Sequence, residues 1–104
     1  ENIELDKLVE RYKDANLRGE DVEIVNNTEY KTQLNNILLS WKTEDQQYLS
    51  VEIYNHKAEK IESVQTSSMQ FEPKQITTEG NYYWKLINED FDLLFCGKII
   101  VEKP

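Results

Sequence analysis

The chain has 104 residues, a length that allows one domain with a single modest core. It is acidic, with a formal net charge of -8, and its basic residues are dispersed. Because nucleic-acid binding depends on clustered Lys and Arg that release counterions, this composition argues against a nucleic-acid partner. A single cysteine, Cys96, and a single histidine, His56, exclude an intrachain disulfide and the Cys/His cluster of a structural zinc site.

The apolar runs are all too short to span a bilayer, so membrane contact is expected only through a segment outside this chain. No signal-peptide pattern opens the sequence, which begins with Glu1 and is interpreted as a fragment of a larger protein. The compartment and the oligomeric state stay open, and the periplasmic or extracellular side is favoured over the cytoplasm.

The first segment predicts one amphipathic helix over residues 3–17. The apolar residues that fall at helical spacing are Leu5, Leu8, Val9 and Tyr12. Asn2 is predicted as the N-cap, and Gly19 as the stop signal. The apolar stripe is narrow, so the helix must pack on another surface to be stable. We therefore divide the chain into a helix or stalk, residues 1–19, and a β-sandwich domain, residues 20–104.

Short stretches of alternating polarity follow at intervals of about ten residues, which is typical of a sandwich rather than of βαβ units. The predicted strands cover 20–25, 37–41, 48–54 and 60–66, with a further short stretch at Met69–Phe71 that ends before Pro73. The first is interpreted as an edge strand, because its charges would protect an open edge. Residues 30–36 are polar and are not assigned.

Residues 80–102 predict a β-hairpin with one buried face, because alternation with period two continues on both sides of the polar turn 88–92. The residues that share the predicted core face are Tyr82, Trp84 and Leu86 in the first strand and Phe95, Gly97, Ile99 and Val101 in the second. In the earlier strand 37–41, Trp41 lies on the core face. Trp41 and Trp84 are therefore expected to be interior neighbours that join two stacked sheets.

The order ILLSW, YLSVEIYN and then Ile76, Gly80, Tyr82 and Trp84 resembles strands B, C and F of fibronectin type III and related bacterial immunoglobulin-like domains. The resemblance covers about residues 34–103. Trp41 matches the tryptophan that ends strand B, although Glu79-Gly80 stands where the family usually has Pro-Gly. The resemblance implies a mainly β, immunoglobulin/fibronectin-III-like antiparallel β-sandwich, to which the N-terminal helix is an addition. It also implies that the Tyr82 hydroxyl bonds back to the preceding loop.

No group of residues predicts catalysis, a cofactor or a metal, so we expect that the chain is not an enzyme. Cys96 lies on the parity opposite the predicted core face, and His56 is placed in a distant turn, so a Cys-His pair is not predicted. The acidic turn 88–92 offers oxygen atoms to a cation, but it lacks the spacing and the glycine of a calcium-binding loop. It is interpreted as a solvated turn.

Three tyrosines, Tyr30, Tyr54 and Tyr83, are the candidate ligand- or partner-binding residues. Outward aromatic side chains on a sheet can contact a sugar ring or a protein, because they combine apolar area with a polar tip. The favoured alternative is that Tyr83, together with Leu38 and Ile87, lies beneath the N-terminal helix or a neighbouring domain.

The sequence leaves two functional hypotheses open. The first is a non-catalytic protein-interaction or spacer domain of a larger bacterial cell-envelope or exported protein, with a protein partner or neighbouring domain. The second is a carbohydrate-binding module that uses outward-facing aromatics. Sugar binding predicts an exposed, coplanar pair or strip of aromatics on one sheet, whereas protein contact predicts a mixed apolar patch or a sheet covered by the helix.

Overall fold

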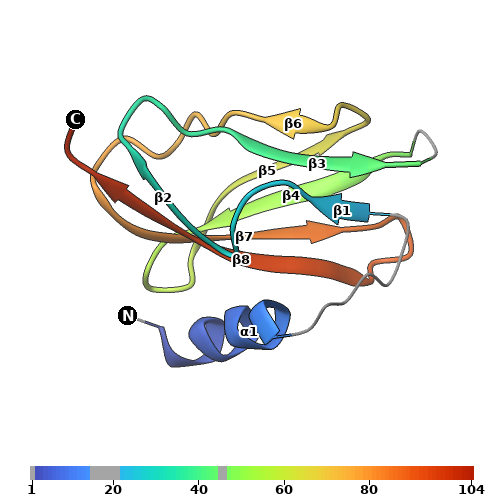
Figure 1. Cartoon of the computed structure of the whole chain (residues 1–104), viewed down its shortest axis with the longest axis horizontal. Helices are drawn as coiled ribbons and strands as arrows, with labels where there is room; N and C mark the ends of the chain where they lie inside the picture. Colours follow the sequence, from blue (N-terminus) through green and yellow to red (C-terminus); the bar gives the residue numbers. More distant parts are fainter. Residues whose placement is uncertain (1, 15–21, 45–46) are drawn as a thin grey trace.

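The computed structural model describes residues 2–14, 22–44 and 47–104, and Figure 1 shows how their elements are arranged. In chain order the elements are α1 (Ile3–Asp14), β1 (Val22–Ile24), β2 (Glu29–Gln33), β3 (Leu39–Thr43), β4 (Leu49–Tyr54), β5 (Lys60–Thr66), β6 (Gln70–Phe71), β7 (Gly80–Ile87) and β8 (Leu93–Glu102). Residues 15–21, which include the end of the predicted helix and its stop signal at Gly19, lie outside the described residues.

The strands form two sheets that face each other, and α1 lies on the far side of the larger one (Figure 1). The smaller sheet has the order β1-β3-β6, and the larger one has the order β2-β8-β7-β4-β5. The predicted class, a mainly β sandwich with one N-terminal helix, is confirmed. The predicted edge strand is also confirmed, because β1 is an outer strand of the smaller sheet.

The strand β2 was not assigned from the sequence, and its pairing is unlike that of its neighbours. It pairs with β8 in parallel, with Tyr30 opposite Ile99, whereas the β7–β8 and β4–β7 pairs are antiparallel. Its sequence EYKTQ is polar, and only Tyr30 and Thr32 are partly buried. In a polar edge strand with one half-buried face, apolar and polar residues hardly alternate. This explains why β2 was not recognised from the sequence.

The main core fills the space between the two sheets. Trp41 from β3 and Trp84 from β7 are both buried, and their ring centroids lie 6.1 Å apart. The predicted interior tryptophan pair is therefore confirmed. Trp84 also packs against Phe95, at 5.1 Å between ring centroids. The other buried residues of this core are Ile37, Leu39, Leu49, Val51, Ile53, Ile76, Tyr82, Leu86, Ile99 and Val101.

Tyr82 forms the bond to the preceding loop that the resemblance implied. Its Oη donates to the carbonyl oxygen of Thr78 at 2.9 Å, and the Oγ1 of Thr78 lies 2.9 Å from the same Oη. Because Tyr82 is only 8% exposed, the hydroxyl has little access to water in exchange for this partner. The bond attaches the loop that precedes β7 to the beginning of that strand.

Replacing Tyr82 with phenylalanine is expected to lower the free energy of unfolding by about 1–2 kcal/mol, because the Thr78 carbonyl loses its hydroxyl partner. The measurement is urea unfolding followed by tryptophan fluorescence. Tyr48→Phe is the matched control, because the Tyr48 side chain is 53% exposed and water replaces its hydroxyl contacts. Equal stability of Tyr82→Phe and the unaltered chain would show that this bond does not fix the corner.

Candidate functional site

Helix α1 is amphipathic and turns its apolar side to the outer face of the larger sheet. The Oδ1 of Asn2 accepts a hydrogen bond from the Leu5 backbone N–H at 3.0 Å, which confirms the predicted N-cap. Leu5 and Val9, one turn apart, are buried, whereas Lys7 and Glu10 are exposed. The helix therefore gains its stability from the sheet beneath it, as its narrow stripe required.

A second buried cluster lies between α1 and the sheet, and it consists of Leu5, Val9, Tyr83 and Cys96. Tyr83 and Cys96 are both fully buried. Tyr83 thus lies under the helix, which was the favoured alternative. Helix α1 does not cover Leu38, which is 43% exposed and precedes β3 in the other sheet, so cover of Leu38 by a neighbouring domain stays a prediction. Ile87 is only half-buried, near the end of β7.

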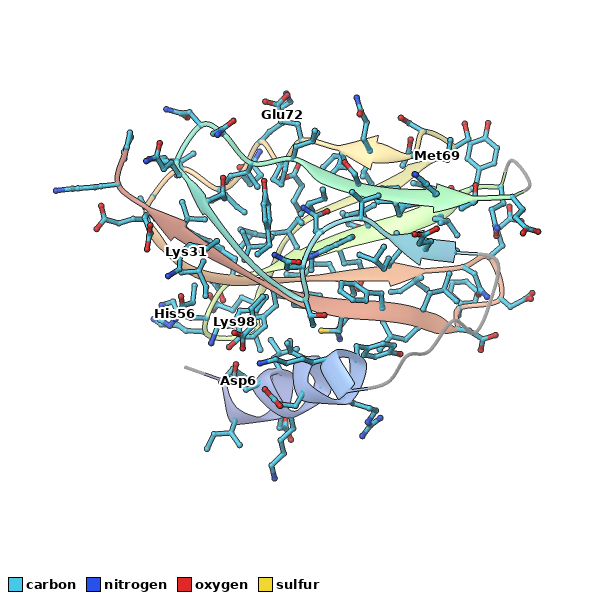
Figure 2. The ribbon with its side chains drawn as sticks, in the orientation of Figure 1. Asp6, Lys31, His56, Met69, Glu72 and Lys98 are labelled. Atoms are coloured by element: carbon cyan, nitrogen blue, oxygen red, sulfur yellow. The ribbon has the colours of Figure 1, made fainter. Side chains whose placement is uncertain are left out.

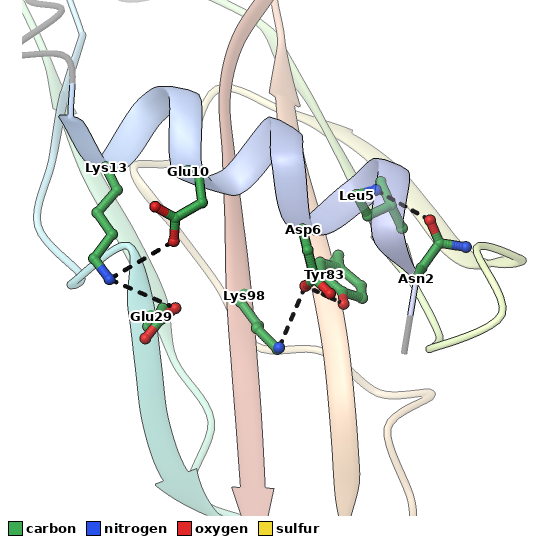
Figure 3. A network of polar contacts seen from close by, with 8 residues as sticks. All are labelled: Asn2, Leu5, Asp6, Glu10, Lys13, Glu29, Tyr83 and Lys98. Carbon is green, nitrogen blue, oxygen red and sulfur yellow. Dashed lines mark hydrogen bonds and ion pairs between the residues drawn. The ribbon is translucent and has the colours of Figure 1, made fainter.

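Polar contacts around Asp6 join the helix to the sheet (Figure 3). The Oδ1 of Asp6 accepts hydrogen bonds from the Tyr83 hydroxyl at 2.6 Å and from the Lys98 ammonium at 3.3 Å. At the other end of α1, the Tyr12 hydroxyl donates to the Leu93 carbonyl at 3.1 Å. We call Asp6, Tyr83 and Lys98 the Asp6 cluster. Because its groups satisfy one another, it orients the helix rather than offering a reactive group.

Cys96 is protonated and covered. Burial raises the pKa of the Cys96 thiol to about 12, and the nearby charge of Lys85 opposes that shift only in part. A reactive cysteine needs a thiolate and access, and Cys96 has neither in this state. His56 is exposed in the turn between β4 and β5. Over residues 2–14, 22–44 and 47–104, no three His, Cys, Asp or Glu side chains gather as a metal site.

Tyr54 is the neighbour of Tyr83 across the β4–β7 pair, so the structure brings these two candidates together. Tyr54 is half-buried, its hydroxyl donates to Glu52 at 2.5 Å, and the Lys85 ammonium lies 4.7 Å from the ring centroid. Burial first, and the bond to Glu52 second, raise the pKa of Tyr54. With Tyr83 covered and Tyr54 flanked by charged side chains, these two rings do not form an exposed strip.

Tyr30 points to the interior. It pairs with the core residue Ile99 and packs against the main core, and its hydroxyl accepts a hydrogen bond from the Leu38 N–H at 3.2 Å. The sequence placed Tyr30 on the surface because β2 was not recognised. The structure therefore does not bring Tyr30 together with Tyr54 and Tyr83.

Three large exposed side chains lie at one end of the sandwich, and the sequence did not single them out. They are Tyr48 in the β3–β4 loop, Met69 in the β5–β6 loop and Phe91 in the β7–β8 turn, with exposed fractions of 53%, 48% and 89%. We call these three residues the loop-end set. The Thr43 N–H donates to the Met69 sulfur at 3.4 Å, so that loop is attached to the end of β3. Figure 2 shows Met69 at the end of the molecule opposite to His56.

Phe91 is held outward by the turn itself. The Asn88 Oδ1 accepts hydrogen bonds from the N–H groups of Asp90 and Asp92, both at 2.9 Å. Phe91 has a φ of 66°, an uncommon conformation for a large residue. A phenylalanine within the acidic turn was visible in the sequence, but periodicity does not show where a turn side chain points.

The comparisons with known proteins concern the fold. No family model matches the chain, and no curated protein matches it. The chain is similar to a solved structure of fibronectin(III)-like modules. These are from Clostridium thermocellum CbhA, with 13% sequence identity and a TM-score of 0.45, over 79% of this chain and 94% of the other. No helix within the described ranges is long and apolar enough to cross a membrane.

Proposed function

We propose that this chain is a non-catalytic protein-interaction module that contacts its partner through the loop-end set. The observation that supports it is the exposure of Tyr48, Met69 and Phe91 from three loops at one end. Tyrosine, phenylalanine and methionine are enriched at the centres of protein interfaces, where their apolar area is removed from water. Phe91 is the strongest candidate for an anchor, because almost all of its ring is exposed.

The direction of the chain favours interaction over a purely linear spacer. Asp6 near the start of α1 contacts Lys98, and Tyr12 near its end contacts Leu93, so α1 runs antiparallel to β8. The helix begins and β8 ends at the end of the sandwich opposite to the loop-end set (Figure 1). The start of α1 and the end of β8 therefore lie away from the loops that carry Tyr48, Met69 and Phe91.

The acidic residues around Phe91 indicate which charges a partner should carry around its binding pocket. Glu89, Asp90 and Asp92 are all exposed beside it in the same turn. A partner with Lys or Arg around an apolar pocket would complement this arrangement, and salt would then slow its association. No described observation favours the carbohydrate alternative, because the tyrosines expected to form an exposed strip do not form one. The location on the periplasmic or extracellular side stays a prediction, which cell fractionation can check.

The test is cross-linking from position 91 in cells that produce the protein. With Phe91 replaced by p-benzoylphenylalanine, we expect a protein adduct on irradiation. The adduct should weaken when Tyr48 and Met69 are both changed to serine. The matched control carries the same cross-linker at the exposed Lys31 of β2, which Figure 2 shows near the other end of the molecule, and should give no such adduct.

With the purified partner, Phe91→Ala is expected to lower the affinity by about tenfold or more in calorimetric titration, because a buried aromatic anchor is typically a hot spot. Lys31→Ala should change the affinity less than twofold. Adducts from position 31 alone, or an affinity indifferent to Phe91, would contradict the proposal. Retardation in polysaccharide gels that is abolished by Phe91→Ala would favour the carbohydrate module instead.

A further inference from the structure

The larger sheet has a separate buried cluster on each of its faces. The inner face carries the main core that both sheets share, and the outer face carries Tyr83 and Cys96 under α1. The two clusters have no buried residue in common. Among the described side chains of α1, Tyr12 packs against both, and it meets Phe95 edge-on at 5.8 Å between ring centroids. Among the described side chains, removing α1 would therefore uncover the main core only where Tyr12 meets Phe95.

Few apolar side chains of the helix are buried against the sheet. Its buried side chains within the described residues are Leu5 and Val9, while Leu8 and Tyr12 are only partly buried. An isolated helix of 12 residues is marginal in water, so α1 would lose its structure once it left the sheet. Segments with few buried apolar contacts open at lower free energy than core strands do. Helix α1 has this character, and β7 and β8 do not.

We propose that α1 is a releasable cover, which leaves the outer face of β7 and β8 as a unit while the sandwich stays folded, and so exposes Cys96 and Tyr83. The open state differs from the closed state in three ways. The Asp6 cluster is broken, the Cys96 thiol reaches solvent, and the larger sheet presents an apolar strip on its outer face. The chain thus has a second surface that is available only after α1 is released.

Cys96 reports on this opening directly, because it is the single cysteine of the chain. The experiment measures the rate at which a thiol reagent labels Cys96 in the native full chain, followed by mass spectrometry. Leu5→Ala removes a buried contact of α1, and it is expected to raise the labelling rate by about tenfold or more. Lys7→Ala changes an exposed residue of the same helix and should leave the rate within twofold.

A variant of the main core separates release of α1 from unfolding of the domain. Val51 is fully buried between the sheets and is not part of the outer cluster. Val51→Ala should lower the urea midpoint of global unfolding but leave the labelling rate in the absence of urea within twofold. If Cys96 were exposed only by global unfolding, Val51→Ala would accelerate labelling in proportion to the stability it removes, and the proposal would be overturned.

The urea dependence of Cys96 labelling in the unaltered chain tests the same proposal without any variant. Release of α1 exposes little surface, so the labelling rate should depend weakly on urea at low concentrations and steeply only where the whole domain unfolds. A rate that rises from zero urea with the full slope of global unfolding would mean that α1 and the sandwich open together. That result would contradict the proposal that α1 is a releasable cover, and it would do so independently of whether the loop-end set binds a partner.

Discussion

Trp84→Ala is expected to lower the free energy of unfolding by about 3–5 kcal/mol, a large part of the stability of an ordinary domain. The indole is fully buried and packs between Trp41, at 6.1 Å, and Phe95, at 5.1 Å. Its removal leaves a cavity at the point where the two sheets meet. In a domain of this size each lost kcal/mol lowers the Tm by roughly 4–8 °C. Calorimetry should therefore show a drop of more than about 10 °C.

The control for lost aromatic area is Tyr48→Ala, which truncates a half-exposed ring and should change the Tm by only about 1–2 °C. Trp84→Phe gives a second comparison. It keeps most of the apolar volume and removes the indole N–H, which is buried with no hydrogen-bond partner among the described residues. It should therefore cost clearly less than Trp84→Ala. A loss below about 1 kcal/mol for Trp84→Ala would contradict the central role of the tryptophan pair.

The parts of the fold that were predicted from the sequence are those in which large apolar residues alternate. Trp84 and Leu86 repeat with period two, and this places them on the same buried face whatever the rest of the chain does. The bond from the Tyr82 hydroxyl to the preceding loop was implied by the resemblance to fibronectin type III domains, and its partner, Thr78, is close in sequence. Both features lie within one short segment, so neither depends on contacts between distant parts of the chain.

The features that were missed depend on contacts between distant segments. Tyr30 faces the core because β2 pairs with β8, about 70 residues further along the chain, and no local pattern encodes that pairing. Leu38 looked like a covered residue, but α1 binds the other sheet, where Tyr83 and Cys96 lie. Both of these features needed the three-dimensional arrangement of the two sheets. The exposure of Phe91, by contrast, depends on the local turn that Asn88 closes, and periodicity does not show where a turn side chain points.

Gly97→Ala is the second substitution with a large expected effect, because no side chain fits at this position. Gly97 lies opposite Trp84 in the β7–β8 pair. A Cβ atom added there would lie 2.6 Å from Phe95 Cε2 and 2.8 Å from Trp84 Nε1. Both rings are buried, so neither can move without disturbing the core. We expect a loss of about 1–3 kcal/mol in the free energy of unfolding, measured with urea.

The double variant Phe95→Leu with Gly97→Ala tests whether the crowding of the ring causes this loss. Leucine lacks the ring edge that approaches the added methyl group, so Gly97→Ala should cost less in the Phe95→Leu background than in the unaltered chain. The two substitutions should then be non-additive by about 0.5 kcal/mol or more. Part of the cost remains, because Trp84 still approaches position 97. Strict additivity would show that the approach of Trp84, rather than the space beside Phe95, requires glycine at this position.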